Sequence, residues 1–96
     1  MTNIKLFIST GAFAENKDEA RDIRMDQITP AIKKGDDVVL DFEGIDGATQ
    51  SFVHALISDV IRKEGFQVIE KLHFKNCNPT VQKIITIVTE YMQESY

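Results

Sequence analysis

Several residue types that mark particular classes of protein are scarce in this chain. Its 96 residues include one cysteine, two prolines and five glycines. The lone Cys77 cannot form an internal disulfide, which fits a reducing compartment. Because so few prolines and glycines leave little room for linkers, we expect a single domain over residues 1–96 with one hydrophobic core.

Positive charge and long apolar runs are scarce as well. Eleven Lys and Arg residues stand against 15 Asp and Glu, a net charge of -4, and the basic residues form no stripe that would offset a phosphate backbone. No apolar run approaches the roughly 18 residues of a membrane span, and residues 1–5 lack the layout of a signal peptide. We therefore expect a cytoplasmic protein with neither nucleic acid nor membrane as a partner.

Short β-prone runs alternate with amphipathic stretches along the chain. Strands are expected at residues 4–8, 38–42 and 72–74, and helices over residues 17–34 and 50–64 and from residue 79 onward. This β-α-β-α-β-α order implies an α/β fold with parallel pairing and right-handed crossovers. A further edge strand is expected at residues 11–14 or 66–69.

The central strand is the most apolar segment. Four of the five residues 38–42 are apolar, and Val38 and Val39 are β-branched, a pattern typical of a strand covered on both faces by helices. Open α/β sheets bind their ligands beyond the carboxyl ends of such strands. The turn at residues 43–48 is therefore the first place to look for function.

Capping residues mark the helix ends. Asn16 and Thr49 are expected N-caps, Asn78 followed by Pro79 starts the last helix, and Gly35 and Gly65 end the first two helices. Proline in a helix interior removes a backbone donor and clashes with the preceding turn, so Pro30 predicts a kink or break near Thr29.

Two helices have well-defined faces. The second helix should bury Phe52, Val53, Leu56, Ile57 and Val60 and should present a polar stripe of Ser51, His54, Ser58 and Arg62 to solvent. In the last helix we expect a core side and one apolar residue, Ile87, that points outward; the core side comprises Val81, Ile84, Ile85, Val88 and Met92.

The turn carries carboxylates and glycines. Asp41, Glu43 and Asp46 could together hold Mg²⁺, but a single acidic strand end is typical of a structural turn, so we predict no metal site and expect Asp41 to accept backbone N–H groups. Gly44 and Gly47 lack the spacing of a dinucleotide-binding loop and the lysine of a P-loop. We expect both glycines to serve turn geometry.

The cysteine and the two histidines do not form a recognisable catalytic set. Cys77, His54 and His73 would supply a nucleophile and a base, yet no third residue orients them. A thiol near a helix start can have a lowered pKa, but we expect Cys77 to be inert and half-buried. The sequence predicts a protein that is not an enzyme and that has no cofactor.

Thr49 and Ser51 lie at the start of the second helix. A phosphate is favoured there by the helix dipole and by free backbone donors, so both hydroxyls are candidate phosphorylation sites. Ser and Thr also serve as caps at this position, and we expect capping as their main role.

The segment Leu40-Asp41-Phe42-Glu43-Gly44-Ile45 followed by Ser51-Phe52 resembles the STAS domain of anti-sigma-factor antagonists. The whole chain is closer still to the STAS-like family of unknown function. Supporting positions elsewhere in the chain are Gly11, Ala20-Arg21, Lys34-Gly35, Asn76 and Val81.

The resemblance implies a small STAS-like fold, with a mostly parallel or mixed sheet of four or five strands and helices mainly on one face. It also implies a regulatory module that binds a partner kinase or ATPase through the start of the second helix, with no catalytic residue. The antagonists carry a loop Asp-Ser-Ser-Gly-Leu whose first serine is phosphorylated, and gap-free alignment places Gln50 at that serine. Ser51 and Thr49 remain as candidate substitutes.

Three hypotheses follow. The leading one is a non-catalytic interaction module that docks a regulatory protein, such as a histidine-kinase-like ATPase, through Asp46, Gly47, Thr49, Gln50, Ser51, His54, Ser58 and Arg62. The alternative is a domain that senses a nucleotide or another small ligand with the helix N-terminus at residues 47–51 as an anion site. A third is a homo-oligomeric structural module joined through the threonine-rich side of the last helix and Ile87. We expect a monomer or a weak homodimer.

Overall fold

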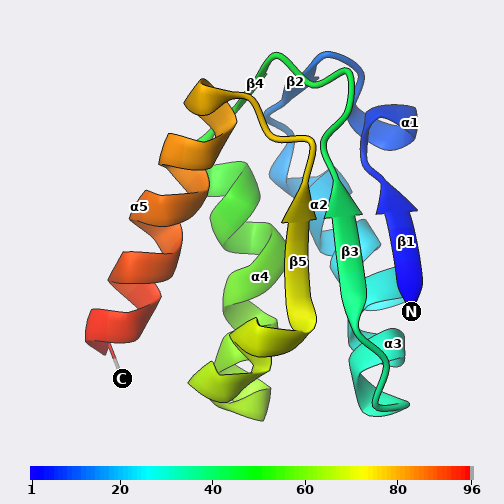
Figure 1. Cartoon of the computed structure of the whole chain (residues 1–96), viewed down its shortest axis with the longest axis vertical. Coiled ribbons are helices and arrows are strands. Elements are labelled where there is room, and N and C mark those ends of the chain that lie inside the picture. Colours follow the sequence, from blue (N-terminus) through cyan, green and yellow to red (C-terminus); the bar gives the residue numbers. More distant parts are fainter. Residues whose placement is uncertain (96) are drawn as a thin grey trace.

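The computed structural model describes residues 1–95 and contains two small parallel sheets. The smaller sheet lies above the larger one in Figure 1. The main sheet has the order β1-β3-β5, formed by Thr2–Lys5, Val38–Asp41 and Leu72–Lys75. The second sheet pairs β2 (Phe13–Ala14) with β4 (Gly47–Ala48). The predicted α/β class and parallel pairing are confirmed.

The prediction of one four- or five-stranded sheet is wrong. Strands β2 and β4 have two residues each and pair only with one another, in the register Phe13 with Gly47 and Ala14 with Ala48. The main sheet ends where Lys5 pairs with Asp41. Because the short β3 offers no further partner, the chain that follows β1 leaves the sheet and forms its own pairing above it.

Three helical segments cover one face of the main sheet. Helices α2 (Lys17–Ile23), α3 (Thr29–Lys33) and α4 (Gln50–Glu64) lie behind the strands in Figure 1, whereas α5 (Pro79–Ser95) packs beside α4. No helix lies in front of the sheet in that view, so the expectation that β3 is covered by helices on both faces is wrong.

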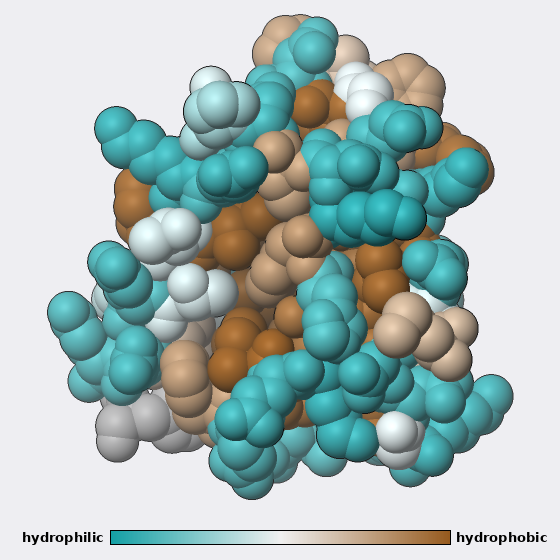
Figure 2. Space-filling model, in the orientation of Figure 1, coloured by the Kyte–Doolittle hydropathy of each residue, from teal (hydrophilic) through white to brown (hydrophobic). Residues whose placement is uncertain are grey.

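The open face of the sheet carries polar side chains around one apolar residue. Asn3 and His73 are exposed and flank Val39 in the same row of the sheet, and Val39 is only 7% exposed. The next row places exposed Lys5 and Lys75 on either side of Asp41. In Figure 2 hydrophilic residues accordingly lie among hydrophobic ones over this face. Neighbouring side chains bury Val39, so this apolar residue is shielded from solvent although no helix covers it.

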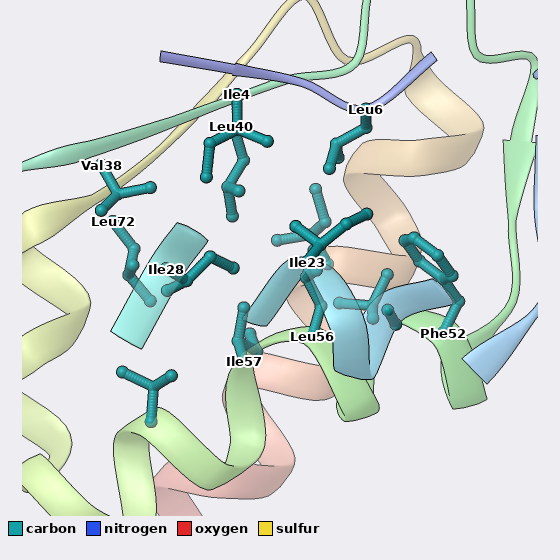
Figure 3. Close-up of a cluster of buried hydrophobic side chains, with 14 of the residues drawn as sticks. Ile4, Leu6, Ile23, Ile28, Val38, Leu40, Phe52, Leu56, Ile57 and Leu72 are labelled. Atoms are coloured by element: carbon teal, nitrogen blue, oxygen red, sulfur yellow. The ribbon is translucent and has the colours of Figure 1, made fainter. Parts of the chain in front are cut away.

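The hydrophobic core lies between the covered face of the sheet and the helices. In Figure 3 the side chains of Ile4, Leu40 and Leu72 point from the strands toward residues of the helical layer, including Leu56 and Ile57. All five are at most 4% exposed. At roughly 1.5–3 kcal/mol for each fully buried large apolar side chain, such a layer is the main favourable contribution to folding.

The first long helix begins as predicted and is interrupted near Thr29, where a kink or break was expected. The Asn16 side chain accepts hydrogen bonds from the N–H groups of Asp18 (2.8 Å) and Glu19 (3.3 Å). A π-helical turn, Arg24–Ile28, then joins α2 to α3, and the N–H of Thr29 bonds to the carbonyl of Arg24. The wider turn directly precedes Pro30, which has no N–H to continue an α-helical ladder.

Glycine ends this helix in the predicted way. Gly35 has a φ of 85°, its N–H bonds to Ile32 and the N–H of Asp36 bonds to Ala31, both at 3.0 Å. These two bonds are those of the Schellman motif, which satisfies the last carbonyls of a helix.

Two predicted strand segments are helical instead. Residues 7 and 8 belong to a single helical turn, α1 (Phe7–Thr10), and residues 66–69 belong to a 3₁₀ helix, Phe66–Lys71. Residues 11–14 do include a strand, but β2 lies in the second sheet.

The predicted caps of the last two helices and the exposure of Ile87 are confirmed. Thr49 caps α4, Gly65 follows it with a φ of 90°, and Asn78 caps α5 by accepting a 2.8 Å bond from the N–H of Val81. Ile87 points outward, with 38% of its surface exposed.

Candidate docking surface

The turn after β3 begins with a hydrogen-bonded carboxylate. Oδ1 of Asp41 accepts a 2.9 Å bond from the N–H of Glu43 and a second 2.9 Å bond from the side-chain amide of Asn76. The Asn76 bond, followed by the Glu43 bond, lowers the pKa of Asp41. Asp41 thus shapes the turn as a hydrogen-bond acceptor, as predicted.

The loop between β5 and α5 fastens the same turn. Asn76 follows β5 with a φ of 58°, a left-handed conformation that asparagine tolerates better than most residues. Two residues later the Asn78 amide donates to the carbonyl of Asp46 at 2.9 Å, while its oxygen caps α5. One asparagine therefore connects the start of α5 to the turn.

The two glycines of the turn have different roles. Gly44 has a φ of 86°, a backbone conformation that residues with a β-carbon rarely adopt. The geometry of the turn therefore explains a glycine at this position. Gly47 has no positive φ and lies in β4. A β-carbon at Gly47 would make only an ordinary contact with Phe13, 3.5 Å from Cδ1 of that ring. The prediction that both glycines serve turn geometry is correct for Gly44 alone.

Backbone bonds to the β2 segment hold the other side of the turn. The N–H of Asp46 donates to Ala12 at 2.7 Å, and the N–H of Thr49 donates to Ala14 at 3.0 Å. Residues 46–49 are thereby tied to β2 on one side and to Asn78 on the other. The turn is fixed in place before α4 begins.

The start of α4 uses one hydroxyl as a cap and leaves the other exposed. Oγ1 of Thr49 accepts a 3.1 Å bond from the N–H of Phe52. Gln50 and Ser51, the first two residues of α4, are both exposed. Capping by Thr49 is therefore confirmed, and Ser51 carries the exposed hydroxyl.

A groove of about 490 Å³ runs from this helix start along the side of α4. Its wall includes Gln50, Ser51 and His54, three of the predicted docking residues. The His54 ring meets the Tyr91 ring of α5 edge to face, with centroids 6.1 Å apart. The structure thus joins the start of α4 to α5 in one surface.

The groove is also lined by residues that no sequence pattern selected. Lys17 comes from the start of α2, and Tyr91 comes from α5 beside the outward-pointing Ile87. Lys17 and Ser51 are far apart in the sequence, and only the packing of α2 against α4 brings them together. The exposed Ile87 was the one available signal that this side of α5 borders a surface.

Five of the eight predicted docking residues do not line the groove. Asp46, Gly47 and Thr49 precede it in the turn, whereas Ser58 and Arg62 lie further along α4. Ser58 is only 4% exposed, so its assignment to the solvent stripe is wrong. Arg62 is exposed but lies near the other end of α4, where it pairs with Asp59 at 3.9 Å. The predicted site residues that lie together, in the turn and the first part of α4, are therefore Asp46, Gly47, Thr49, Gln50, Ser51 and His54.

Ser58 is buried in a helix that packs against both α2 and α5. Arg24 donates a 2.8 Å bond to the carbonyl of Ala55 and lies 3.9 Å from Asp59. These contacts hold the π-helical turn that follows α2 against α4.

The cysteine and the histidines each have separate partners. Burial, with a smaller contribution from the charge of Asp41, raises the pKa of the Cys77 thiol. His73 lies 3.0 Å from Asp37, and His54 contacts Tyr91. The raised pKa agrees with the prediction of an inert thiol, since the thiolate is the reactive form.

Within residues 1–95, no three His, Cys, Asp or Glu residues are grouped so that they could hold a metal ion. Over the same part of the chain, no helix combines the length and the apolar character needed to cross a bilayer.

The fold and the site together define a small α/β domain that presents a fastened turn and an exposed helix start. Residues 19–82, more than half of the chain, match the sequence model of a family described as a STAS-like domain of unknown function. The chain belongs to this family, which links it coarsely to the fold of the anti-sigma-factor antagonists. No curated protein and no solved structure matches the chain.

Proposed function

We propose that this chain is a non-catalytic regulatory module of the cytoplasm that docks a partner protein, a histidine-kinase-like ATPase or another regulator. Docking takes place through the turn at residues 46–49 and the first turn of α4. The observation that supports this most is that hydrogen bonds hold the turn on two sides. Ala12 and Ala14 accept bonds from it on one side, and Asn78 donates a bond to it on the other. A surface that is rigid before binding loses less conformational entropy when a partner docks.

The groove beside the helix start supports the same proposal. Gln50, Ser51 and His54 offer hydrogen-bonding groups, and Ile87 and Tyr91 offer apolar and aromatic surface. Interfaces combine such aromatic anchors with a polar rim.

Capture experiments with surface variants test this proposal. The double variant Gln50→Arg, His54→Glu places new charges in the groove while leaving the buried face of α4 intact. Its matched control, Thr86→Glu with Gln93→Arg, introduces the same charges at exposed positions of α5 that do not line the groove. We expect wild type and control to retain the same partner and the groove variant to lose it. Equal capture by all three proteins would rule out this surface.

Ser51 is the hydroxyl at which phosphorylation would regulate docking. It is exposed at the second position of α4, whereas Thr49 is engaged as the cap. A phosphate there would lie near the positive end of the helix dipole and in the groove that Lys17 lines. Incubation with the captured kinase and mass spectrometry would test this: modification of wild type but not of Ser51→Ala is expected.

Lys17 also favours a second candidate function, the sensing of a nucleotide or another anionic small ligand at residues 47–51. A cation beside the N-terminus of a 15-residue helix suits a phosphate group. Titration with ATP, ADP and inorganic phosphate, followed through the amide resonances of residues 47–52, distinguishes the two functions. Absence of shifts at millimolar ligand would eliminate this candidate.

A further inference from the structure

Three large apolar side chains are exposed in the segment that precedes α2. The exposed fractions are 46% for Phe7, 81% for Ile8 and 64% for Phe13. Figure 2 shows hydrophobic side chains, in tan and brown, at the top of the molecule, where Figure 1 places α1, β2 and β4. Clusters of exposed apolar side chains mark sites of protein interaction. We call Phe7, Ile8 and Phe13 the apolar edge.

The apolar edge is continuous with the turn after β3. A β-carbon at Gly44 would lie 3.0 Å from Cδ2 of Phe7, and one at Gly47 would lie 3.5 Å from Cδ1 of Phe13. Each phenyl ring therefore lies against one glycine of the turn. A partner that touches the turn also meets these two rings.

The charges within the segments that carry the apolar edge have one sign, and Lys5, Lys17 and Lys75 border these segments. Residues 6–16 and 42–50, which form this end of the molecule, contain Glu15, Glu43 and Asp46 but no Lys, Arg or His. All three carboxylates are exposed. Residues 76–80, which fasten the turn, carry no charge. Phe13 and Glu15 also line a shallow groove of about 250 Å³ that reaches Ile84 of α5.

We infer that the apolar edge and its three carboxylates dock a basic, apolar segment of a partner protein. The inference rests on the proposed function and adds the chemistry of the partner. Arg and Lys side chains would pair with the carboxylates and stack on the phenyl rings, while apolar side chains would cover Ile8. Self-association through this surface is disfavoured, because it would bring two sets of three carboxylates together.

The apolar edge lies outside the region that matches the family model, whereas Glu43 and Asp46 lie within it. Phe7, Ile8 and Phe13 all precede residue 19, where the family match begins.

Two synthetic peptides serve as probes of the inference. Both carry the same Leu and Phe residues, and one has Arg where the other has Glu. Each is titrated into the whole ¹⁵N-labelled chain while the amide resonances are recorded. We expect the Arg peptide to shift residues 7–15 and 43–48 and the Glu peptide to leave them unchanged. An equal response to both peptides would overturn the inference.

Charge variants show whether the three carboxylates select the peptide. The triple variant Glu15→Gln, Glu43→Gln, Asp46→Asn should bind the Arg peptide roughly tenfold more weakly, because each exposed pair contributes a factor of about two to three. Its control, Asp26→Asn with Glu64→Gln and Glu70→Gln, makes the same change in net charge at exposed positions elsewhere. An equal loss in both variants would show attraction by net charge alone and would overturn the inference.

A second pair of variants tests the aromatic contact. Phe13→Ser should weaken binding of the Arg peptide, whereas Met25→Ser, at a residue 58% exposed, should not.

Other patterns of shifts would overturn this inference. If the Arg peptide shifts residues 50, 54 and 91 and not the apolar edge, the inference is overturned while docking at α4 still stands. Concentration-dependent shifts of residues 7–13 without peptide would assign the surface to a second copy and overturn it too. Failure of the proposed function would instead appear as unchanged capture by the Gln50→Arg, His54→Glu variant.

Discussion

The side-chain amide of Asn76 donates a 2.9 Å hydrogen bond to Oδ1 of Asp41 across the ends of two neighbouring parallel strands. Through this bond the segment after β5 holds the first residue of the turn that leads to α4. Asn76 also has a φ of 58°, so both its hydrogen bond and its backbone conformation affect stability. Substitutions at this position can measure the two contributions separately.

Two substitutions at Asn76 should therefore differ in stability. Asn76→Gly keeps the left-handed backbone and loses the hydrogen bond, which costs about 1 kcal/mol of unfolding free energy. Asn76→Ala loses the bond and also strains the backbone, for an additional cost of about 1–2 kcal/mol. Urea unfolding of both variants measures the difference. Equal stability of the two variants would show that the backbone conformation contributes nothing.

The lowered pKa of Asp41 predicts a pH dependence of stability. An aspartate titrates near 3.9 in an unfolded chain, and the bonds from Asn76 and Glu43 lower this pKa in the folded chain. The carboxylate therefore contributes stability above about pH 4, and the contribution is lost as the pH falls through the folded pKa. The stability advantage of wild type over Asp41→Asn should shrink over that acidic range in urea unfolding series. An advantage that grows in acid would contradict this assignment.

Gly44 and Gly47 should respond differently to the same substitution. Gly44→Ala forces a side chain into a φ of 86° and brings a β-carbon within 3.0 Å of the Phe7 ring. We expect a loss of at least about 1–2 kcal/mol. Gly47→Ala has an ordinary φ and makes an ordinary 3.5 Å contact with Phe13, so its loss should be smaller. Thermal unfolding compares the two variants, and a larger loss for Gly47→Ala would contradict the geometry described above.

Cys77 should react slowly with alkylating reagents in the folded chain. Burial raises the pKa of its thiol, so less thiolate is present at neutral pH. Iodoacetamide should modify the folded chain more slowly than the chain unfolded in urea, and the count is unambiguous because Cys77 is the only cysteine. Asp41→Asn removes a charge that raises the pKa and should speed the reaction slightly. Faster reaction of the folded chain would contradict an inert thiol.

The helices could be predicted well because their signals are local. Asn16, Thr49 and Asn78 act as caps, Gly35 and Gly65 end helices, and the structure confirms each of these roles. Pro30 predicted the position at which the first long helix is interrupted. It did not predict that the interruption is a π-helical turn.

The strands were harder to predict because pairing decides their length. Phe7 and Ile8 are β-prone, but β3 ends at Asp41 and leaves them no partner, so they form a helical turn. Strands β2 and β4 are two residues long and depend on contact between distant segments. No periodicity within either segment could have shown this pairing.

The candidate site was predicted where it depends on one helix start and missed where it depends on packing. Gln50, Ser51 and His54 do share a groove, as their common position at the start of α4 suggested. Ser58 lies on the polar side of the helical wheel and is nevertheless buried, because other helices pack around α4. Lys17 and Tyr91 join the site only through the packing of α2 and α5.

Photocrosslinking from defined positions tests the docking claim most directly. A benzophenone side chain at residue 50 or residue 54 faces the groove, and one at residue 93 is exposed but does not line it. If the start of α4 is the docking surface, positions 50 and 54 should crosslink to the same partner protein in cells and position 93 should not. Crosslinks of equal yield from all three positions, or crosslinks from position 93 alone, would contradict this account.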